Sequence, residues 1–327
     1  MSELDTPEMV SQALREATLE IRTRVGRTFV GNEALVDSVW AAILARGHVL
    51  LEGGPGLGKT LLVKLFGRLL GLEVGRVQFT PDLMPTDILG GQVLRPSASG
   101  PAVEFKAGPV FTQLLLADEI NRANPRTQSA LLEAMAERQV TIAGETRPLD
   151  RAFFVLATNN PIDMEGTYPL PEAQADRFLM KVGVNAPSRE VILEILDVKA
   201  DDALNDATPC VKAEHLEMFR QHIADIPASD SVRGLIADLV IATQPSEENP
   251  EIQLGASPRA AQGLLSAARS RAGMAGRLHV TESDVTAMVP MVLRHRVIMS
   301  YAARAEGASP ERFIERILRR YGQATAP

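Results

Sequence analysis

The sequence predicts an α/β protein in which a five-stranded parallel sheet is flanked by helices and followed by a smaller all-α domain. Two observations carry this prediction. Between residues 48 and 184, five apolar runs alternate with segments of helical periodicity, which is typical of strands covered on both faces. After Pro187 the apolar residues recur at helical spacing alone. We therefore expect an α/β domain over residues 1–186 and an α-helical domain over residues 187–327.

The elements follow in chain order. Residues 1–47 carry two helical patterns, the second over residues 32–46. Residues 48–52 form an apolar run that stops at a glycine cluster, and a helical pattern resumes at Lys59, which predicts strand, loop and helix. The other strands are expected at residues 74–79, 114–117, 152–157 and 180–184. The later helices are expected at residues 188–199, 212–224, 229–243, 257–272, 281–300 and 309–321.

Two segments interrupt this alternation. Residues 91–106 predict two short strands around a Ser/Gly turn, and residues 139–147 predict a second hairpin that turns near Gly144. Both hairpins precede a core strand, so we interpret them as inserts in the α/β domain.

The composition argues against several classes of protein. The chain has 327 residues, of which 45% are apolar and 23% charged, an ordinary globular mixture. A net charge of −7 and an aromatic content of 4% disfavour a non-specific binder of nucleic acid, which needs clustered Lys and Arg. The single cysteine, Cys210, cannot form an internal disulfide. With no signal-peptide pattern and no long apolar stretch, a cytoplasmic location is the expectation.

Residues 53–60 read Gly-Gly-Pro-Gly-Leu-Gly-Lys-Thr and fit the pattern G-x-x-x-x-G-K-[ST]. Glycines allow backbone N–H groups to turn inward around phosphates, Lys59 supplies a charge to the β- and γ-phosphates, and Thr60 offers a hydroxyl to Mg²⁺. The alternative is a flexible glycine-rich turn, which the preceding strand and the following helix disfavour. The predicted nucleotide-binding residues of this loop are Gly54, Pro55, Gly56, Leu57, Gly58, Lys59, Thr60 and Leu61.

A second candidate site lies where the apolar run at 114–117 ends in Asp118 and Glu119. Asp118 would bind Mg²⁺ through water, and Glu119 would polarise the water that attacks the γ-phosphate. The alternative is a strand end followed by a helix-capping acid, and the glycine loop upstream favours the functional interpretation.

Further candidates lie downstream. Asn160, or else Asn159, ends the run at 152–157, where an amide could hold the attacking water or a phosphate oxygen; an Asn-Pro turn is the alternative. Arg177 and Arg259 each offer a guanidinium group that could stabilise the charge of phosphoryl transfer. A solvated or salt-bridged arginine is the alternative for both.

The remaining basic and histidine residues favour no site. The tripeptide Arg294-His-Arg296 is expected to be a solvated helix face, with a partner contact as the alternative. The histidines show no metal-ligand spacing, so we expect them to be structural or solvated. They are His48, His215, His222, His279 and His295.

With these motifs, the chain resembles the MoxR family of AAA+ ATPases, within the group that carries a helix-2 insert. The resemblance spans residues 30–296. Its most specific strings are Asp-Glu-Ile-Asn-Arg-Ala at 118–123 and Glu-Gly-Thr-Tyr-Pro-Leu at 165–170. The supporting segments are residues 47–60, 78–90, 108–111, 157–161, 176–178 and 255–259.

The resemblance implies a ring-forming, usually hexameric, ATPase whose nucleotide lies between neighbouring subunits. Arg177 resembles the arginine finger, which reaches the γ-phosphate of the next subunit. Arg259 resembles sensor 2, which reaches the nucleotide of its own subunit, and Asn160 resembles sensor 1. Val30 and Gly31 resemble the segment near adenine. The cofactors implied are ATP and Mg²⁺, the latter held by Thr60 and Asp118.

In function, the family is similar to chaperones that mature enzyme complexes or insert metal cofactors. It often works with a partner that has a von Willebrand factor A domain. The hairpin at 91–106 resembles the helix-2 insert, and the hairpin at 139–147 resembles the pre-sensor hairpin; both would be remodelling elements. The alternatives are a nucleic-acid-stimulated motor, an ATP-gated scaffold without turnover, and a magnesium-chelatase-like motor subunit.

Overall fold

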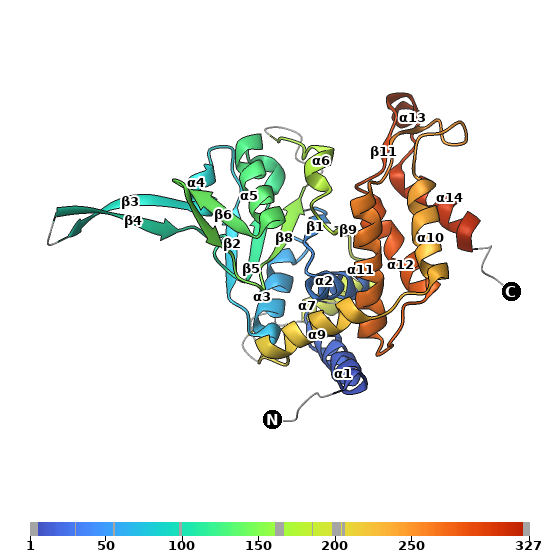
Figure 1. The fold of residues 1–327 in the computed structure, drawn as a ribbon, viewed down its shortest axis with the longest axis horizontal. Coiled ribbons are helices and arrows are strands. Elements are labelled where there is room, and N and C mark those ends of the chain that lie inside the picture. Colours follow the sequence, from blue (N-terminus) through green and yellow to red (C-terminus); the bar gives the residue numbers. More distant parts are fainter. Residues whose placement is uncertain are drawn as a thin grey trace.

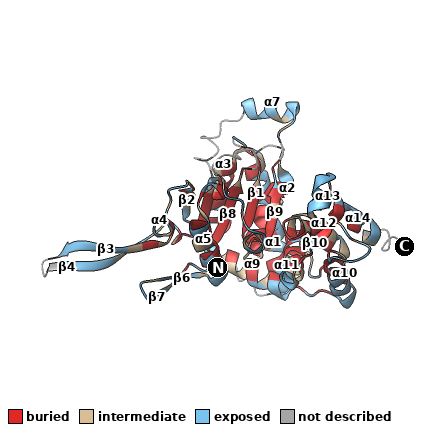
Figure 2. Cartoon of the chain, turned by 90° about the horizontal axis from the view of Figure 1, so that it is seen from above, coloured by how far each residue is buried: buried red, intermediate tan, exposed pale blue. Residues whose placement is uncertain are grey.

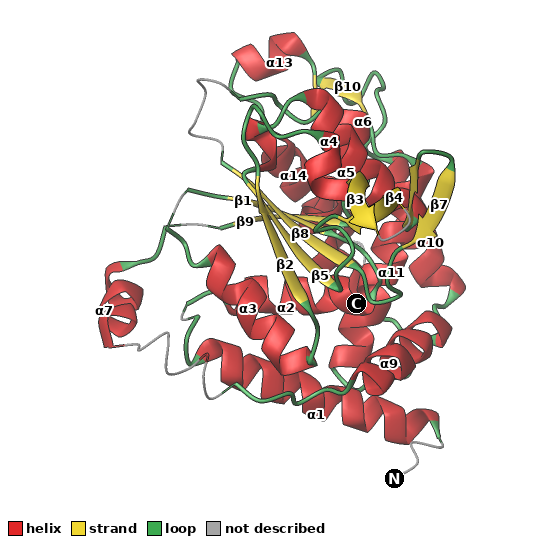
Figure 3. Cartoon of the chain, turned by 90° about the vertical axis from the view of Figure 1, so that its left-hand side faces the viewer, coloured by secondary structure: helices red, strands yellow, loops and turns green. Residues whose placement is uncertain are grey.

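The computed structural model describes residues 6–29, 31–54, 56–97, 100–160, 167–184, 186–197, 204 and 207–322. Its centre is a sheet in the order β2-β5-β8-β1-β9, in which neighbouring strands are parallel. This confirms the predicted five-stranded parallel sheet, whose strands fan out between helices in Figure 3. The strands are β1 (Val49–Glu52), β2 (Val74–Gln78), β5 (Leu114–Asp118), β8 (Phe154–Asn159) and β9 (Met180–Gly183).

Helices cover both faces of the sheet because its central strands, β5, β8 and β1, are apolar on both sides. One face, which includes Leu51 and Leu116, shares a core with α1, α2 and α3. The other face, which includes Leu50 and Leu115, packs against α4 and α5. These helices are α1 (Pro7–Gly26), α2 (Glu33–Leu44), α3 (Lys59–Leu70), α4 (Pro85–Leu89) and α5 (Pro125–Glu137).

Local chemistry fixes where two of these helices begin. The side chain of Thr6 accepts a hydrogen bond from the backbone N–H of Met9, and α1 starts at the next residue with a proline. In the same way, Asn124 accepts from the N–H of Thr127 before the proline that opens α5. A polar cap followed by proline suits a helix start, because proline fixes φ and needs no N–H partner there.

The C-terminal part of the chain is mainly helical, as predicted, and lies beside β9 in Figure 1. Its apolar side chains share one continuous core with α2 and one face of the sheet. The N-terminal helix α1 packs against both α9 and α11, so it joins the two parts. The helices here are α9 (Ala213–Asp225), α10 (Asp230–Ile241), α11 (Pro258–Met274), α12 (Glu282–Leu293), α13 (Tyr301–Ala305) and α14 (Pro310–Gly322).

One short pair of strands departs from the predicted run of helices. The helix expected over residues 281–300 ends at Leu293, and β11 (Ile298–Met299) pairs antiparallel with β10 (Ile252–Leu254). Strands of two and three residues show no alternation that a sequence pattern can reveal. Periodicity therefore predicted a longer helix than the chain forms.

Both predicted hairpins are present. The strands β3 (Gly90–Ser97) and β4 (Gly100–Ala107) pair antiparallel and project far from the sheet in Figure 1. The second hairpin, β6 (Gln139–Ile142) and β7 (Glu145–Pro148), is shorter and follows α5. Figure 2 shows that the hairpins and the helix α7 (Arg189–Asp197) are mostly exposed, whereas the sheet is mostly buried.

Candidate functional site

The glycine loop lies between β1 and α3, as predicted. Gly56 and Gly58 have φ values of 78° and 72°, a left-handed conformation that other residues rarely adopt. The Nζ of Lys59 donates a hydrogen bond to the carbonyl of Gly53 at 2.9 Å. Burial lowers the pKa of Lys59, while the nearby carboxylates of Asp118 and Glu119 act in the opposite direction. The lysine therefore lies between the loop and the acidic pair.

The other predicted nucleotide-binding residues lie in this loop, at the start of α3 and near residue 31. Leu57 and Leu61 pack against the main core, and Thr60 is the second residue of α3. A side chain at Gly31 would meet Val191 of α7 at 2.6 Å, so Gly31 lies directly against that helix. Val30 and Pro55 lie outside the described residues.

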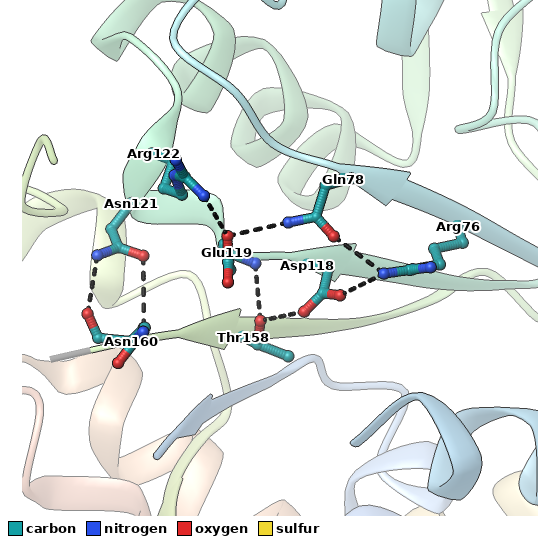
Figure 4. A network of polar contacts seen from close by, with 8 residues as sticks. All are labelled: Arg76, Gln78, Asp118, Glu119, Asn121, Arg122, Thr158 and Asn160. Atoms are coloured by element: carbon teal, nitrogen blue, oxygen red, sulfur yellow. Dashed lines mark hydrogen bonds and ion pairs between the residues drawn. The ribbon is translucent and has the colours of Figure 1, made fainter. Parts of the chain in front are cut away.

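The acidic pair ends β5. The Oδ1 of Asp118 accepts a hydrogen bond from the hydroxyl of Thr158 at 2.8 Å, and its Oδ2 accepts from Arg76 at 2.8 Å (Figure 4). Gln78, the register partner of Asp118, also accepts a hydrogen bond from Arg76. Both carboxylate oxygens of Asp118, the predicted Mg²⁺ ligand, thus accept hydrogen bonds, one of them from the cation of Arg76.

Glu119 follows in a strained conformation. Its φ of 57° is left-handed, which costs a non-glycine residue about 1–2 kcal/mol. Its backbone N–H donates to the hydroxyl of Thr158 at 2.7 Å, which fixes this turn. Its Oε2 accepts hydrogen bonds from Gln78 at 3.0 Å and Arg122 at 3.1 Å (Figure 4). Backbone strain of this kind concentrates at functional sites.

Sequence reasoning did not identify the partners of this acidic pair. Arg76 and Gln78 lie on β2, Thr158 on β8, and Arg122 in the turn after β5. One signal was available: residues 76 and 78 place two long polar side chains on one face of the strand predicted at residues 74–79.

The two asparagines at the end of β8 have different surroundings. The side chain of Asn159 donates to Oε1 of Glu52 at 3.2 Å, and Glu52 also pairs with Lys181 at 2.8 Å. Asn160 is 5% exposed. The side-chain oxygen of Asn121 accepts a hydrogen bond from the backbone N–H of Asn160, and the side-chain nitrogen of Asn121 donates to the backbone carbonyl of Asn160. Both lie at the carboxyl edge of the sheet, the same edge as the glycine loop and the acidic pair.

Arg177 lies elsewhere. It precedes β9, and the N–H of Leu179 donates to the carbonyl of His48 at the amino end of β1. Among the described residues, its guanidinium group makes one hydrogen bond, to the carbonyl of Leu132 at 3.1 Å. The opposite ends of β1 are about 10 Å apart by strand rise alone. Arg177 therefore lies toward the edge of the sheet opposite the glycine loop of its own chain.

Arg259 departs from the predicted role. It is the second residue of α11, its side chain is 59% exposed, and its guanidinium group lies 3.8 Å from Oδ2 of Asp176. It therefore lies beside the segment of Arg177, near the amino end of β9, and does not reach the glycine loop of its own chain. The reason is the position of the C-terminal part, which packs against α2 and β9.

The tripeptide at 294–296 was also predicted incorrectly. His295 and Arg296 are 9% and 6% exposed, so this is no solvated helix face. Arg296 binds Asp176 by an ion pair of 2.6 Å. His48 is buried too, which agrees with a structural histidine: it accepts from the N–H of Val155 at 3.0 Å, and burial lowers its pKa to about 3.

The residues present fit a nucleotide with Mg²⁺. The glycine loop has the left-handed turns that a phosphate cradle needs, and a buried lysine and two carboxylates lie beside it. Within the described ranges, no group of three or more His, Cys, Asp or Glu could hold a metal ion by itself. In the same ranges, no helix has both the length and the apolarity to cross a membrane.

Comparisons with known proteins agree with this site. Residues 48–180 match the model of the ATPase family associated with various cellular activities (AAA), and residues 244–317 match an AAA lid domain. Chaperone MoxR1 of Mycobacterium tuberculosis is 42% identical over 93% of this chain and 81% of its own length. Protein MoxR of Methylorubrum extorquens is 31% identical over 87% of this chain and 88% of its own length.

A solved structure extends the likeness to the fold. An ATPase from Cytophaga hutchinsonii superposes with a TM-score of 0.88 at 39% sequence identity, and the match covers 98% of both chains. The matches to the AAA family model, to MoxR1 and to this structure together show that the chain is an ATPase. The sequence similarity, the phosphate loop and the parallel sheet agree, and the chain belongs to the MoxR family of AAA+ ATPases.

Proposed function

We propose that the chain is an Mg²⁺-dependent ATPase that works as a ring, with each nucleotide between two subunits, and remodels other proteins. The single observation that carries this proposal is the separation of Arg177 from the glycine loop. The loop, Lys59 and the acidic pair lie at the carboxyl edge of the sheet, whereas Arg177 lies near its amino edge. A second copy can supply the guanidinium group that one chain lacks at its own nucleotide.

The proposed roles follow from this arrangement. The glycine loop and Lys59 bind the phosphates, and Thr60 and Asp118 hold Mg²⁺, which would neutralise charge on the phosphates when bound. Glu119 orients the attacking water, and Asn160 contacts that water or the γ-phosphate. Because Arg259 lies beside Asp176, we propose that it faces the same neighbouring nucleotide as Arg177. We propose a nucleotide-binding α/β domain over residues 1–186 and an α-helical lid domain over residues 187–327.

Turnover as a function of protein concentration tests the composite site. The specific ATPase activity should rise with concentration as copies associate, and sedimentation should give a hexamer over the same range. Arg177→Ala should bind fluorescent ADP normally and lose at least 10³-fold in turnover. Wild-type turnover of Arg177→Ala, or a specific activity that does not depend on concentration, would contradict a site shared between copies.

Two further variants test the phosphate site independently. Lys59→Ala should lose nucleotide binding, because it removes the charge beside the phosphates. Glu119→Gln should bind ATP and retain it unhydrolysed, because an amide cannot accept the proton of water. If Lys59→Ala keeps the affinity of the wild type, the loop does not bind phosphate as proposed.

The remodelling role rests on a relative that is named a chaperone. We propose a cytoplasmic client complex, a partner with a von Willebrand factor A domain, and a role in the maturation of enzymes or the insertion of metal cofactors. The exposed hairpin β3–β4 is the proposed remodelling element, since Leu94 and Val103 face each other there at 73% and 61% exposure. The test is ATP-dependent recovery of a purified metalloenzyme from its unloaded form, with Glu119→Gln as the inactive control. Stimulation by DNA that falls steeply with salt would instead favour a nucleic-acid motor.

A further inference from the structure

The segment that carries Arg177 is held by side chains from the C-terminal part of the chain. Residues 176–179 connect α6 (Glu172–Ala175) to β9. Arg296, which follows α12, is buried against this segment (its side chain is 3% exposed). The contact joins two regions that are 120 residues apart in the sequence.

All the hydrogen-bonding capacity of Arg296 is used here. A guanidinium group has five N–H donors. The Nε donates to Oδ1 of Asp176 at 2.6 Å, and one terminal nitrogen donates to the carbonyls of Asp176 at 3.0 Å and Phe178 at 2.7 Å. The other terminal nitrogen donates to the carbonyls of Leu179 at 3.1 Å and Val292. The fork therefore holds the backbone on both sides of Arg177.

Neighbouring groups strengthen the same contact. The Nε2 of His295 lies 3.0 Å from the carbonyl of Phe178. Burial keeps the pKa of His295 well below its usual value, so the ring is neutral and this nitrogen can donate. Burial also lowers the pKa of Arg296, but Asp176 opposes that effect with a charged hydrogen bond. Phe178 itself is 0% exposed, so the segment is anchored from both sides.

We propose that Arg296 is a positioning residue for ATP hydrolysis: it fixes the backbone that carries Arg177, so that the Arg177 guanidinium group meets the nucleotide of the neighbouring copy. This inference rests on the role proposed for Arg177. The guanidinium group of Arg177 makes one hydrogen bond to the described residues, so its placement depends on the peptides beside it. A displacement of about 1 Å can reduce turnover by about 100-fold. Arg296 also connects the C-terminal part of the chain directly to residues 176–179, which include Arg177.

Arg296→Lys is the first test. It keeps the buried positive charge but has three donors in place of five and no planar fork. We expect turnover to fall by about 10- to 100-fold. The affinity for fluorescent ADP should stay within about twofold of the wild type, because Arg296 is remote from the glycine loop.

The decisive readout is the same substitution in a chain that already lacks Arg177. Single-turnover hydrolysis of radiolabelled ATP can measure the low rates involved. If Arg296 acts through Arg177, Arg296→Lys should change the rate of Arg177→Ala by less than about twofold. A purely structural role would reduce the rate by the same factor in both backgrounds, and that result would overturn the proposal.

Arg220→Lys is the matched control. Arg220 is also buried (3% exposed) and donates to the backbone carbonyls of Ile43 at 2.9 Å and Arg151 at 3.5 Å, away from the segment of Arg177. Arg220→Lys should lower the stability of the fold. Any change in turnover should be the same whether Arg177 is present or replaced by alanine. If it mimics Arg296→Lys in both backgrounds, the effect is general and the proposal fails.

Other outcomes have equally clear meanings. Wild-type turnover of Arg296→Lys would overturn the positioning role. If that variant does not fold, Asp176→Asn removes the charge that Arg296 binds while keeping the shape of the side chain, and the same two-background criterion applies. Wild-type turnover of Arg177→Ala would refute the role proposed for Arg177 itself, which is a different failure from one confined to Arg296.

Discussion

Acid should destabilise this protein through His48, and the size of the effect can be worked out from the structure. His48 is 4% exposed and lies where β1 begins. Its Nδ1 accepts a hydrogen bond from the N–H of Val155 at 3.0 Å, and its Nε2 lies 3.3 Å from the carbonyl of Met135. A neutral ring satisfies both contacts, whereas a protonated ring would place an N–H against the N–H of Val155.

Burial is the main reason why the pKa of His48 falls to about 3 in the folded state, and the positive charge of Arg138 adds to it. In the unfolded chain a histidine titrates near 6.5. The unfolded state therefore binds more protons than the folded state below pH 6.5, and the free energy of unfolding falls as the pH decreases toward 3. Between pH 7 and pH 5 this group should cost about 2 kcal/mol.

The measurement is urea unfolding, followed by circular dichroism, at pH 7 and pH 5. His48→Gln keeps a donor and an acceptor but cannot be protonated, so it should lose about 2 kcal/mol less than the wild type over this interval. His279→Gln is the matched control, because His279 is exposed, and it should keep the pH dependence of the wild type. Equal losses for wild type and His48→Gln would refute the assignment of a buried neutral ring.

Three further predictions concern single side chains. Arg76→Gln removes the cation that lies 2.8 Å from Asp118, so the Mg²⁺ concentration needed for half-maximal nucleotide binding should fall about two- to fivefold. An unchanged midpoint in a magnesium titration would contradict this prediction. Asp284→Asn should destabilise the fold by about 2–3 kcal/mol in urea unfolding, because Asp284 is 0% exposed and paired with Arg277; a loss below about 1 kcal/mol would show that the pair matters little. Gly234→Ala should stabilise the fold by about 0.5–1 kcal/mol, since an added Cβ meets no atom within 4 Å in this exposed position of α10; a lower melting temperature would contradict that.

The sequence was sufficient for the features that depend on local pattern. The core strands are apolar runs with ends marked by glycine or acidic residues, so β1 and β5 were predicted to within two residues. The glycine loop was also predictable, because its chemistry requires a fixed spacing of small residues and a lysine. The hairpins were visible as polar segments with glycine at the turn.

The sequence was insufficient where contacts depend on register or packing between distant segments. Gln78 meets Glu119 because β2 and β5 are neighbours in a particular register, and no periodicity carries that information. Arg296 looked solvated because a charged residue near a helix end usually is. Its burial follows from the packing of α12 against β9, because the residues just before β9 supply carbonyl groups that its fork requires.

The charges around the acidic pair give a physical reason for the proposed site between two copies. Asp118 already binds Arg76, and Glu119 already binds Arg122, while Lys59 lies against the carbonyl of Gly53. The cations near an entering nucleotide are therefore already bound to other groups. To bind a phosphate, Lys59 must break its hydrogen bond to the carbonyl of Gly53. Phosphoryl transfer then adds charge on the equatorial oxygens, which needs a guanidinium group free to reach them. Since Arg177 lies near the opposite edge of the sheet, our proposal takes that group from another copy of the chain.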